Sequence, residues 1–262
     1  MDFARLDGYS RVRRLASDMA RSKVGPAAVE RWLPAFPDPC GSAVLDLGCG
    51  EGGALETLAR AAGLAGMAVG IDPSSALLER ARSRTVLGTR LELVRAQAEA
   101  LPFPDQWFGL CWCDRVLSHV AVVEHALSEV IRVLRPGGSM FISLFDYCAL
   151  RWVGQADSRL QALLARYVGS VRHPALAKTL AADLRSCGML VHVEERDQHS
   201  LVGWRQILRG TAALHWARQA LDEGSLRQED LPGKATRWRA APGNPGPQLQ
   251  VDMLTVLASR PE

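Results

Sequence analysis

This sequence of 262 residues has no apolar run near the roughly 20 residues that a membrane-spanning helix needs. Its opening stretch, MDFARLDGYSRVRR, also lacks the apolar segment of a secretory signal. We therefore expect no membrane insertion and a cytoplasmic location. Charge of one sign is not in excess either, because 31 Lys and Arg face 28 Asp and Glu, and the basic residues are scattered. Nucleic acid is not expected as a partner.

Paired cysteine motifs are missing as well. The six cysteines include no C-x-x-C pair, and half of them lie in apolar, strand-like runs, which favours reduced thiols. Cys111 and Cys113 alternate on one side of a strand, but no second pair lies nearby in sequence, so we expect no metal site. The composition, 48% apolar and 23% charged, is typical of a globular protein, and the length allows one large α/β domain or a domain with decorations.

Short apolar runs alternate with segments of helical spacing from residue 43 onward. The runs at 43–47, 67–72, 91–96, 108–113 and 139–145 predict strands, and the segments at 53–63, 75–84 and 122–134 predict helices. Such alternation is typical of repeated βαβ units with a parallel sheet between two helical layers. We expect a doubly wound, Rossmann-like α/β fold with its cofactor-binding core at 43–145.

Two later runs, at 190–195 and 250–259, predict further strands. The second follows a loop-like stretch rich in proline and glycine rather than a helix, so an antiparallel last strand is expected. Three segments fall outside the alternation, namely a helical N-terminal cap at 1–40 and insertions at 146–174 and 200–241. Ligands of open α/β sheets bind beyond the carboxyl ends of the strands, and these insertions are candidates to cover that crevice.

The stretch VLDLGCGEGG contains two glycine patterns. Gly48, Gly50 and Gly53 match the dinucleotide pattern G-x-G-x-x-G, whereas Asp46, Gly48, Gly50 and Gly52 match D-x-G-x-G-x-G. Asp46 is predicted at the carboxyl end of a strand, where a carboxylate repels a pyrophosphate and attracts a cation. S-adenosylmethionine, which carries an ammonium and a sulfonium and no phosphate, fits better than NAD. The alternative is that Asp46 only caps the turn through its own backbone.

Asp72 ends the next predicted strand, about 20 residues after the glycines. A carboxylate there can accept two hydrogen bonds from ribose hydroxyls, which both NAD and S-adenosylmethionine possess. The alternative reading is a cap for the helix that begins near Ser74. Asp72 therefore supports a nucleoside ligand without choosing between the two.

Several motifs occur together and in order: VLDLGCGEGG, VGID, RAQAEALPFPDQWFG, CDRVLSHV and EVIRVLRPGGSMFIS. With them the sequence resembles the class I S-adenosylmethionine-dependent methyltransferases, in particular the ubiquinone/menaquinone-type small-molecule branch. The resemblance implies a single methyltransferase domain over residues 1–262, S-adenosyl-L-methionine as cofactor, and insertions that shape an acceptor pocket. It leaves the acceptor and the oligomeric state open.

The resemblance also implies which residues bind the cofactor: Asp46, Gly48, Cys49, Gly50, Gly52, Asp72, Gln97, Ala98, Cys113, Asp114 and Arg115. Gln97 stands where the family usually has an acidic partner for the adenine amine, and Ala98 offers its backbone amide to the ring. Cys113, Asp114 and Arg115 match positions along the methionine end. Gly109 replaces a usual acidic residue.

Methyl transfer from a sulfonium is an in-line displacement that depends mainly on proximity and orientation. A hydroxyl or protonated amine acceptor also needs a base, and His119 is the candidate, with simple packing against the cofactor as its alternative. Aromatic residues in the variable segments predict a small hydrophobic or aromatic acceptor if they line one pocket, or they seal the insertions onto the core. These residues are Tyr147, Trp152, Tyr167, Trp204 and Trp216.

The predicted function is methylation of an O, N or C atom of a small metabolite of specialised or quinone metabolism. A NAD-dependent oxidoreductase of the same fold is the rival within enzymes. A protein that binds S-adenosylmethionine without transferring its methyl group is the rival from another class.

Overall fold

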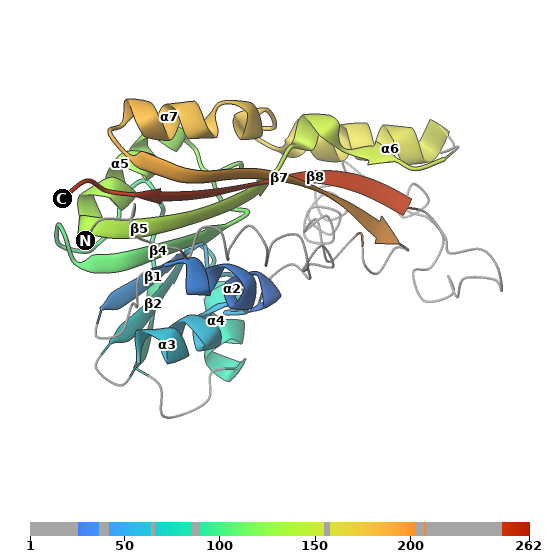
Figure 1. Ribbon diagram of the computed structural model, residues 1–262. Helices are drawn as coiled ribbons and strands as arrows, with labels where there is room; N and C mark the ends of the chain where they lie inside the picture. The colour runs from blue at the N-terminus through green and yellow to red at the C-terminus, as the bar shows by residue number, and fades with distance from the viewer. Residues whose placement is uncertain are drawn as a thin grey trace. The chain divides into compact units, whose positions relative to one another are not determined.

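The computed structural model describes residues 26–36, 42–63, 66–84, 90–154, 158–202, 207 and 248–262 (Figure 1). The chain divides into two compact units. Unit 1 comprises Met1–Ser143, Leu180–Glu194 and Thr255–Glu262, and unit 2 comprises Leu144–Thr179 and Glu195–Leu254. Of the predicted N-terminal cap only 26–36 is described, and most of the 200–241 insertion lies outside the described residues.

The sheet of unit 1 is doubly wound, as the alternating pattern predicts. Its strands run in the order β3-β2-β1-β4-β5, and their register is parallel throughout, with β8 on the far side of β5. The five parallel strands are β1 (Ala43–Leu47), β2 (Met67–Asp72), β3 (Leu91–Arg95), β4 (Phe108–Asp114) and β5 (Leu134–Phe145). The expected fold class, mostly parallel with an antiparallel last strand, is confirmed.

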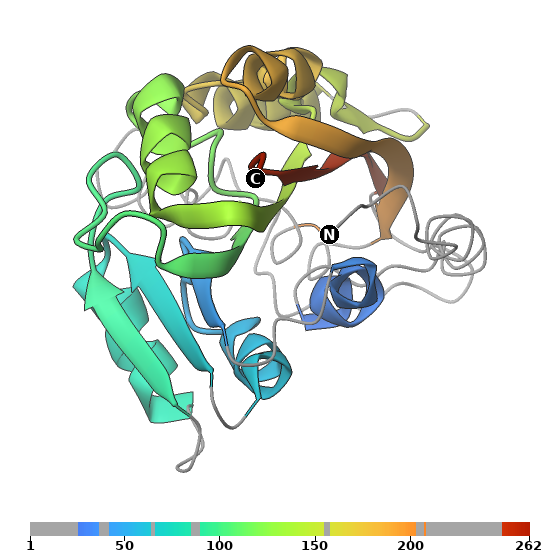
Figure 2. The same cartoon turned by 60° about the vertical axis from the view of Figure 1, so that its left-hand side comes forward.

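Helices cover both faces of this sheet (Figures 1 and 2). One face carries α2, which is followed by the short η2, and also α3 and α4. The other face carries α5 and α7. Their bounds are α2 (Pro26–Trp32), η2 (Leu33–Ala35), α3 (Leu55–Ala62), α4 (Ser75–Arg84), α5 (Val123–Val133) and α7 (Leu180–Ser186).

A buried apolar cluster joins α2 and α3 to the middle of the sheet. At its centre the ring of Trp112 stacks on that of Phe141, with centroids 3.7 Å apart. Register partners on parallel strands point to the same face, so Asp46, which is level with Trp112, lies at the carboxyl-end border of this cluster. The core of unit 1 thus ends in a polar group just where the strands end.

Strand β5 begins five residues before the predicted 139, at Leu134. Phe108 pairs with Leu134 and Leu110 with Ser139, so the intervening residues of β5 form a bulge against β4. The prediction missed this start because a proline and two glycines are typical of a turn. Gly109 of β4 stands where the family that the sequence resembles usually has an acidic residue. Packing explains this glycine, since a Cβ there would lie 2.8 Å from the Cβ of Ser42.

Unit 2 contains η3 (Tyr147–Ala149), β6 (Arg151–Trp152), α6 (Ser158–Ser170) and η4 (Leu176–Lys178). It also holds the larger parts of β7 (Leu190–Val202) and β8 (Gln248–Ser259), which pair with each other, and β6 pairs with β8 in antiparallel register. Helix α6 was not predicted. The aromatic residues Tyr147 and Tyr167 meet edge to face, 6.0 Å apart, inside its buried cluster.

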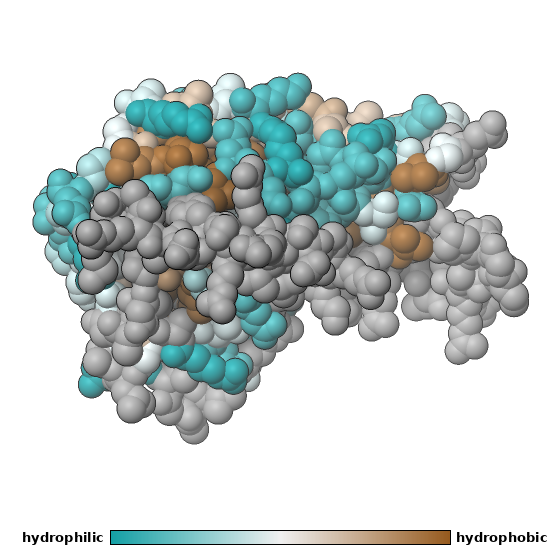
Figure 3. All heavy atoms as spheres, viewed as in Figure 1, coloured by the Kyte–Doolittle hydropathy of each residue, from teal (hydrophilic) through white to brown (hydrophobic). Residues whose placement is uncertain are grey.

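Hydrophilic side chains cover much of the described surface in the view of Figure 3, and apolar ones gather in small patches. Among the described residues, the most exposed large apolar side chain is Leu190, at 52%. None of the described helices combines the length and the apolar character that a bilayer crossing requires.

Candidate functional site

The turn after β1 has left-handed backbone at three glycines, Gly48, Gly50 and Gly52, with φ of 69°, 54° and 77°. At Gly48 a Cβ would lie 2.4 Å from Cγ2 of Val116, so packing as well as backbone conformation excludes a side chain. At Gly50 a Cβ would meet no atom of the described residues within 4 Å. The backbone of Gly50 therefore borders open space, where a ligand can approach it closely.

Asp46 is buried near the carboxyl end of β1, with 4% of its surface exposed. Its Oδ2 is also buried and has no hydrogen-bond partner among the described residues. Burial, and then the charges of Asp114 and Asp72, raises the pKa of this carboxyl to about 8. Oδ2 accepts no amide of the glycine turn, so it gives no support to the alternative reading in which Asp46 caps that turn. A buried acceptor without a partner is instead suited to a cationic donor.

Asp72 is buried at the end of β2 and has partners for both carboxylate oxygens. Oδ2 accepts from the backbone N of Gly50 at 3.1 Å, and Oδ1 accepts from that of Ser74 at 2.8 Å. Ser74 in turn caps α4, because its Oγ accepts from the N of Leu77 at 3.3 Å. Asp72 thus ties the glycine turn to the start of α4. Each of its oxygens retains a second lone pair, so the predicted ribose contact stays a prediction.

Asp114, at the end of β4, is compensated by its neighbours. Arg115 donates to both of its oxygens from Nε and Nη2, each at 3.2 Å, and the hydroxyl of Ser143 donates to Oδ1. The backbone N of Arg115 also donates to the carbonyl of Ser143 at 2.7 Å, and Arg115 has a φ of 61°. Ser143 was not predicted as a site residue, although a serine within the apolar β5, level with Asp114, is a usable signal.

Gln97 and Ala98 lie in the turn that follows β3, where the Gln97 side chain is exposed and Ala98 is buried. Arg132 of α5 holds the loop beyond this turn by donating to the carbonyls of Leu101 at 3.0 Å and Phe103 at 2.8 Å. It also pairs with Glu129 and Asp105. This support was not predicted from the sequence, because Arg132 lies about 30 residues away along the chain.

The site cysteines are buried thiols. Cys49 follows Gly48, and its backbone N donates to the carbonyl of Ile71 at 2.8 Å, which fixes the turn to β2. Burial raises the pKa of Cys49 and that of Cys113 above the ordinary thiol value. Both side chains are therefore neutral at physiological pH and contribute shape rather than charge. Among the described residues, no three His, Cys, Asp or Glu side chains gather as metal ligands.

His119 lies in a turn after β4, and its side chain is exposed. Its backbone N donates to the carbonyl of Val116, at 2.8 Å, the residue that packs against Gly48. The structure thus connects His119 to the glycine turn through Val116. Its role as a base stays a prediction.

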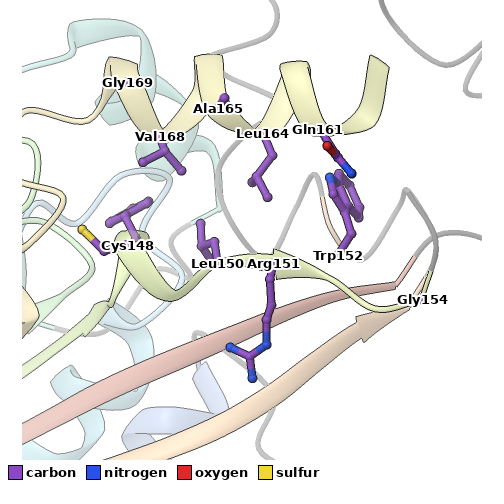
Figure 4. A pocket seen from close by; sticks show the side chains of 11 residues that line it. Cys148, Leu150, Arg151, Trp152, Gly154, Gln161, Leu164, Ala165, Val168 and Gly169 are labelled. Carbon is purple, nitrogen blue, oxygen red and sulfur yellow. The ribbon is translucent and has the colours of Figure 1, made fainter. Parts of the chain in front are cut away.

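Unit 2 contains a pocket of about 660 Å³ between α6 and the η3–β6 segment (Figure 4). Leu164 and Val168 point into it from α6, and Leu150 faces them from the opposite wall. Trp152 closes one side, with its Nε1 donating to the carbonyl of Leu160 at 2.9 Å. Arg151 points away from α6. Three of the five aromatic residues, Tyr147, Trp152 and Tyr167, thus lie in unit 2, whereas Trp204 and Trp216 are outside the described residues.

Comparison with known proteins finds that residues 45–142 match the family described as "Methyltransferase domain". The chain is 30% identical over 190 residues to the ubiquinone/menaquinone biosynthesis C-methyltransferase UbiE of Erwinia tasmaniensis. The matched region covers 67% of this chain and 73% of that protein. It is 36% identical over 153 residues to an uncharacterised 37.1 kDa protein in a transposon of Streptomyces fradiae, and it spans only 44% of that relative.

Among solved structures, the [4+2]-cyclase SpnF superposes with a TM-score of 0.55 at 22% identity, over 85% of this chain and 76% of that one. This likeness concerns the fold alone, and a cyclase is among the proteins that share it. The activity has to be argued from the sequence relatives and from the site.

Proposed function

Since this chain belongs to the class I S-adenosylmethionine-dependent methyltransferases, in the ubiquinone/menaquinone branch, we propose that it methylates a small aromatic metabolite of quinone-like chemistry. Its cofactor is S-adenosylmethionine, as the motif order predicts. The acceptor class is suggested by the relative's name, which refers to ubiquinone and menaquinone biosynthesis.

One observation carries the fit of the cofactor: a buried carboxylate oxygen without a partner lies beside a glycine turn that borders open space. Oδ2 of Asp46 would accept from the methionine ammonium, and the backbone at Gly50 leaves room for the nucleoside. A pyrophosphate in the same place would face the carboxylates of Asp72 and Asp114 and could not pair with Asp46, whereas an ammonium group can. This charge distribution supports S-adenosylmethionine over NAD.

We assign the remaining cofactor contacts on the same basis. Asp72 would use its free lone pairs for the ribose hydroxyls, and Gln97 with the Ala98 amide would hold the adenine. The segment Cys113–Arg115 would border the methionine end. The cofactor supplies a methyl group on a positively charged sulfur that leaves as a neutral thioether, so the chain itself needs to orient the reactants and exclude water.

A base is needed where the acceptor must lose a proton before it attacks. The imidazole of His119 is exposed, and histidine is the side chain type most often used as a general base, so we assign His119 to accept the proton of an acceptor hydroxyl. The pocket of unit 2 is our candidate for the apolar body of the acceptor. Its volume of about 660 Å³ suits a small molecule, and Leu150, Leu164 and Val168 give it an apolar lining.

The whole chain would act as one methyltransferase domain in which the segment 146–174 contributes this pocket. A cytoplasmic location agrees with the five free cysteines of the described residues, Cys49, Cys111, Cys113, Cys148 and Cys187, because thiols persist in a reducing compartment.

Incubation with S-adenosylmethionine labelled in its methyl group tests the proposal, with reduced naphthoquinones of varied side chain as acceptors. We expect label to enter the quinol and S-adenosylhomocysteine to accumulate in equal amount. Calorimetry with S-adenosylmethionine and with NAD accompanies it, and only the first should bind. Tight cofactor binding without label transfer to any of a broad acceptor panel would favour the non-methylating rival, and binding of NAD alone would favour an oxidoreductase.

A further inference from the structure

Three carboxylates end neighbouring strands of unit 1, and each has a different set of partners. Asp72 on β2 accepts two backbone amides, and Asp114 on β4 accepts from Arg115 and Ser143. Asp46 on β1, between them in the strand order, has a buried Oδ2 without a partner among the described residues. The most buried of the three acids is therefore the one with the least compensation.

No cation faces Asp46 from the described elements that pack against it. Strand β2 brings Asp72, the turn brings Cys49, and β4 brings Asp114 with the two buried thiols Cys111 and Cys113. The guanidinium of Arg115 donates to Asp114. On the helices covering this face, Arg60 of α3 pairs with Glu56, Arg80 of α4 pairs with Glu51, and the Arg31 guanidinium of α2 lies over the ring of Trp32. None of these cations is among the charges that shift the pKa of Asp46.

An ionised carboxylate in this position would be desolvated and surrounded by like charge. Taking an unpaired ion out of water costs more than retaining a proton does, so such groups neutralise themselves. In agreement, burial and the two neighbouring carboxylates raise the pKa of Asp46 to about 8. The charge balance changes only when a cation arrives next to Oδ2.

We infer that Asp46 is a neutral carboxylic acid in the free protein and that it loses its proton to the solvent as the ammonium group of a ligand binds. The O–H bond of the acid breaks, its electron pair stays on the carboxylate, and the buffer takes the proton. The new carboxylate and the ammonium form an ion pair, which ligands without an amino acid moiety cannot form. This inference rests on the proposed function, because it takes the methionine ammonium as that cation.

The coupling has a defined pH dependence. Where Asp46 is protonated in the free protein and ionised in the complex, each bound ligand releases about one proton, so the affinity rises roughly tenfold per pH unit. This rise continues up to the pKa of the free carboxyl and then levels off. Asp46 would therefore discriminate ammonium-bearing nucleosides from neutral ones least at low pH.

The test is isothermal calorimetry at pH 7.0 in phosphate and in Tris, whose ionisation enthalpies differ, with three ligands. S-adenosylmethionine and S-adenosylhomocysteine carry the ammonium, and 5′-methylthioadenosine lacks it. We expect about one proton released per molecule of the first two and none for the third. Equal enthalpies in both buffers for S-adenosylmethionine would overturn the inference while leaving the proposed function intact. So would proton release by 5′-methylthioadenosine.

Variants test whether the proton that is released on binding comes from Asp46. Asp46→Asn should abolish proton release and make the affinity independent of pH between 6 and 7.5. Asp114→Asn removes the like charge that raises the pKa of Asp46 more than Asp72 does, and it should release less than the parent at pH 7.0. The exposed Glu124→Gln on α5 should behave as the parent does. Undiminished proton release by Asp46→Asn would overturn the assignment.

A measurement on the ligand-free parent protein depends neither on ligand binding nor on the folding of any variant. With ¹³C-labelled aspartate, one side-chain carboxyl carbon, that of Asp46, should titrate near pH 8 by NMR. If every aspartate carboxyl titrates below pH 5, Asp46 is ionised in the free protein and the inference is wrong. This outcome is distinct from a failure of the proposed function, which would appear as absent S-adenosylmethionine binding or absent methyl transfer.

Discussion

The carboxyl ends of β1, β2 and β4 differ from the pocket of unit 2 in backbone conformation and in whether their buried polar groups have partners. At the strand ends, Gly48, Gly50 and Arg115 have left-handed backbone and Asp46 is buried without a partner among the described residues. Around the pocket the polar groups are satisfied by the local chain. The Trp152 indole donates to the Leu160 carbonyl, for example.

The difference indicates where each region obtains its specificity. Strained backbone and an uncompensated acid destabilise the free protein, and they persist where binding of a ligand offsets them. None of the described residues that line the pocket has a buried polar side-chain atom without a partner, and as the proposed acceptor site it would select by shape and apolar contact. Replacing Asp46 by a neutral side chain should therefore stabilise the first region at the expense of binding, whereas substitutions at the pocket wall should change acceptor affinity alone.

The largest effect is expected at Asp46. Its folded-state pKa of about 8 lies above the 3.8 of the unfolded chain, so the native state keeps a proton that the unfolded chain loses between these values. Stability therefore falls as pH rises through this window. Ligand-free Asp46→Asn should be about 5 kcal/mol more stable than the parent at pH 8.5 and nearly equal near pH 4. Urea unfolding at both pH values measures this.

The same variant should bind S-adenosylmethionine more than tenfold more weakly, about 1.4 kcal/mol or more. If parent and variant are equally stable at pH 8.5, Asp46 does not destabilise the free protein. The left-handed glycines would then be the remaining difference between the two regions.

Two neighbouring glycines form a matched pair. Gly48→Ala adds a Cβ 2.4 Å from Val116 to an unfavourable φ, and it should cost about 3 kcal/mol of stability. Gly50→Ala adds only the unfavourable φ and should cost about 1 kcal/mol. Because the Gly50 side faces open space, its methyl should nevertheless weaken S-adenosylmethionine binding. Thermal unfolding and calorimetry separate the two effects, and equal stability losses would contradict the packing difference.

Arg132 tests whether support from outside the strand ends also matters. Arg132→Met removes the hydrogen bonds to the carbonyls of Leu101 and Phe103, which should cost about 2 kcal/mol and weaken cofactor binding through the loop beyond Gln97. Arg260→Met is the control, because its guanidinium binds other carbonyls, those of Ile131 and Leu134. It should lower the melting temperature without changing the cofactor Kd. Equal loss of affinity in both variants would assign the effect to general destabilisation.

The smallest effect on stability is expected in unit 2. Leu164→Trp fills the pocket and should raise the acceptor KM about tenfold while the S-adenosylmethionine Kd stays constant. Ala162→Trp, at an exposed position on the same helix and outside the pocket lining, should leave both constants unchanged. Steady-state kinetics with a methylated quinol as product decides this, and an unchanged KM in Leu164→Trp would exclude the pocket as the acceptor site.

Much of unit 1 was predictable because its signals are local. Apolar runs and helical spacing identified β1 to β4 and α3 to α5 within a few residues, and the glycines of the turn appear as the positive φ angles that glycine favours. The start of β5 was missed because its proline and glycines are typical of a turn, and α6 was missed because its segment showed no clear relation to the alternation. The pairing of the start of β5 and the packing of α6 along the pocket depend on residues distant in sequence, so neither produces a strong local pattern.

The order and type of the strands, the glycine turn and the acid before it follow from the sequence alone, since each depends on neighbours within a few residues. Only the tertiary structure decided that Asp72 and Asp114 have partners whereas Asp46 has none, because those partners come from Gly50, Ser74, Arg115 and Ser143. Two of these four, Gly50 and Ser143, lie more than 20 residues from the acid that they bind. The charge of a buried group depends on what the fold brings beside it, and no local pattern contains that information.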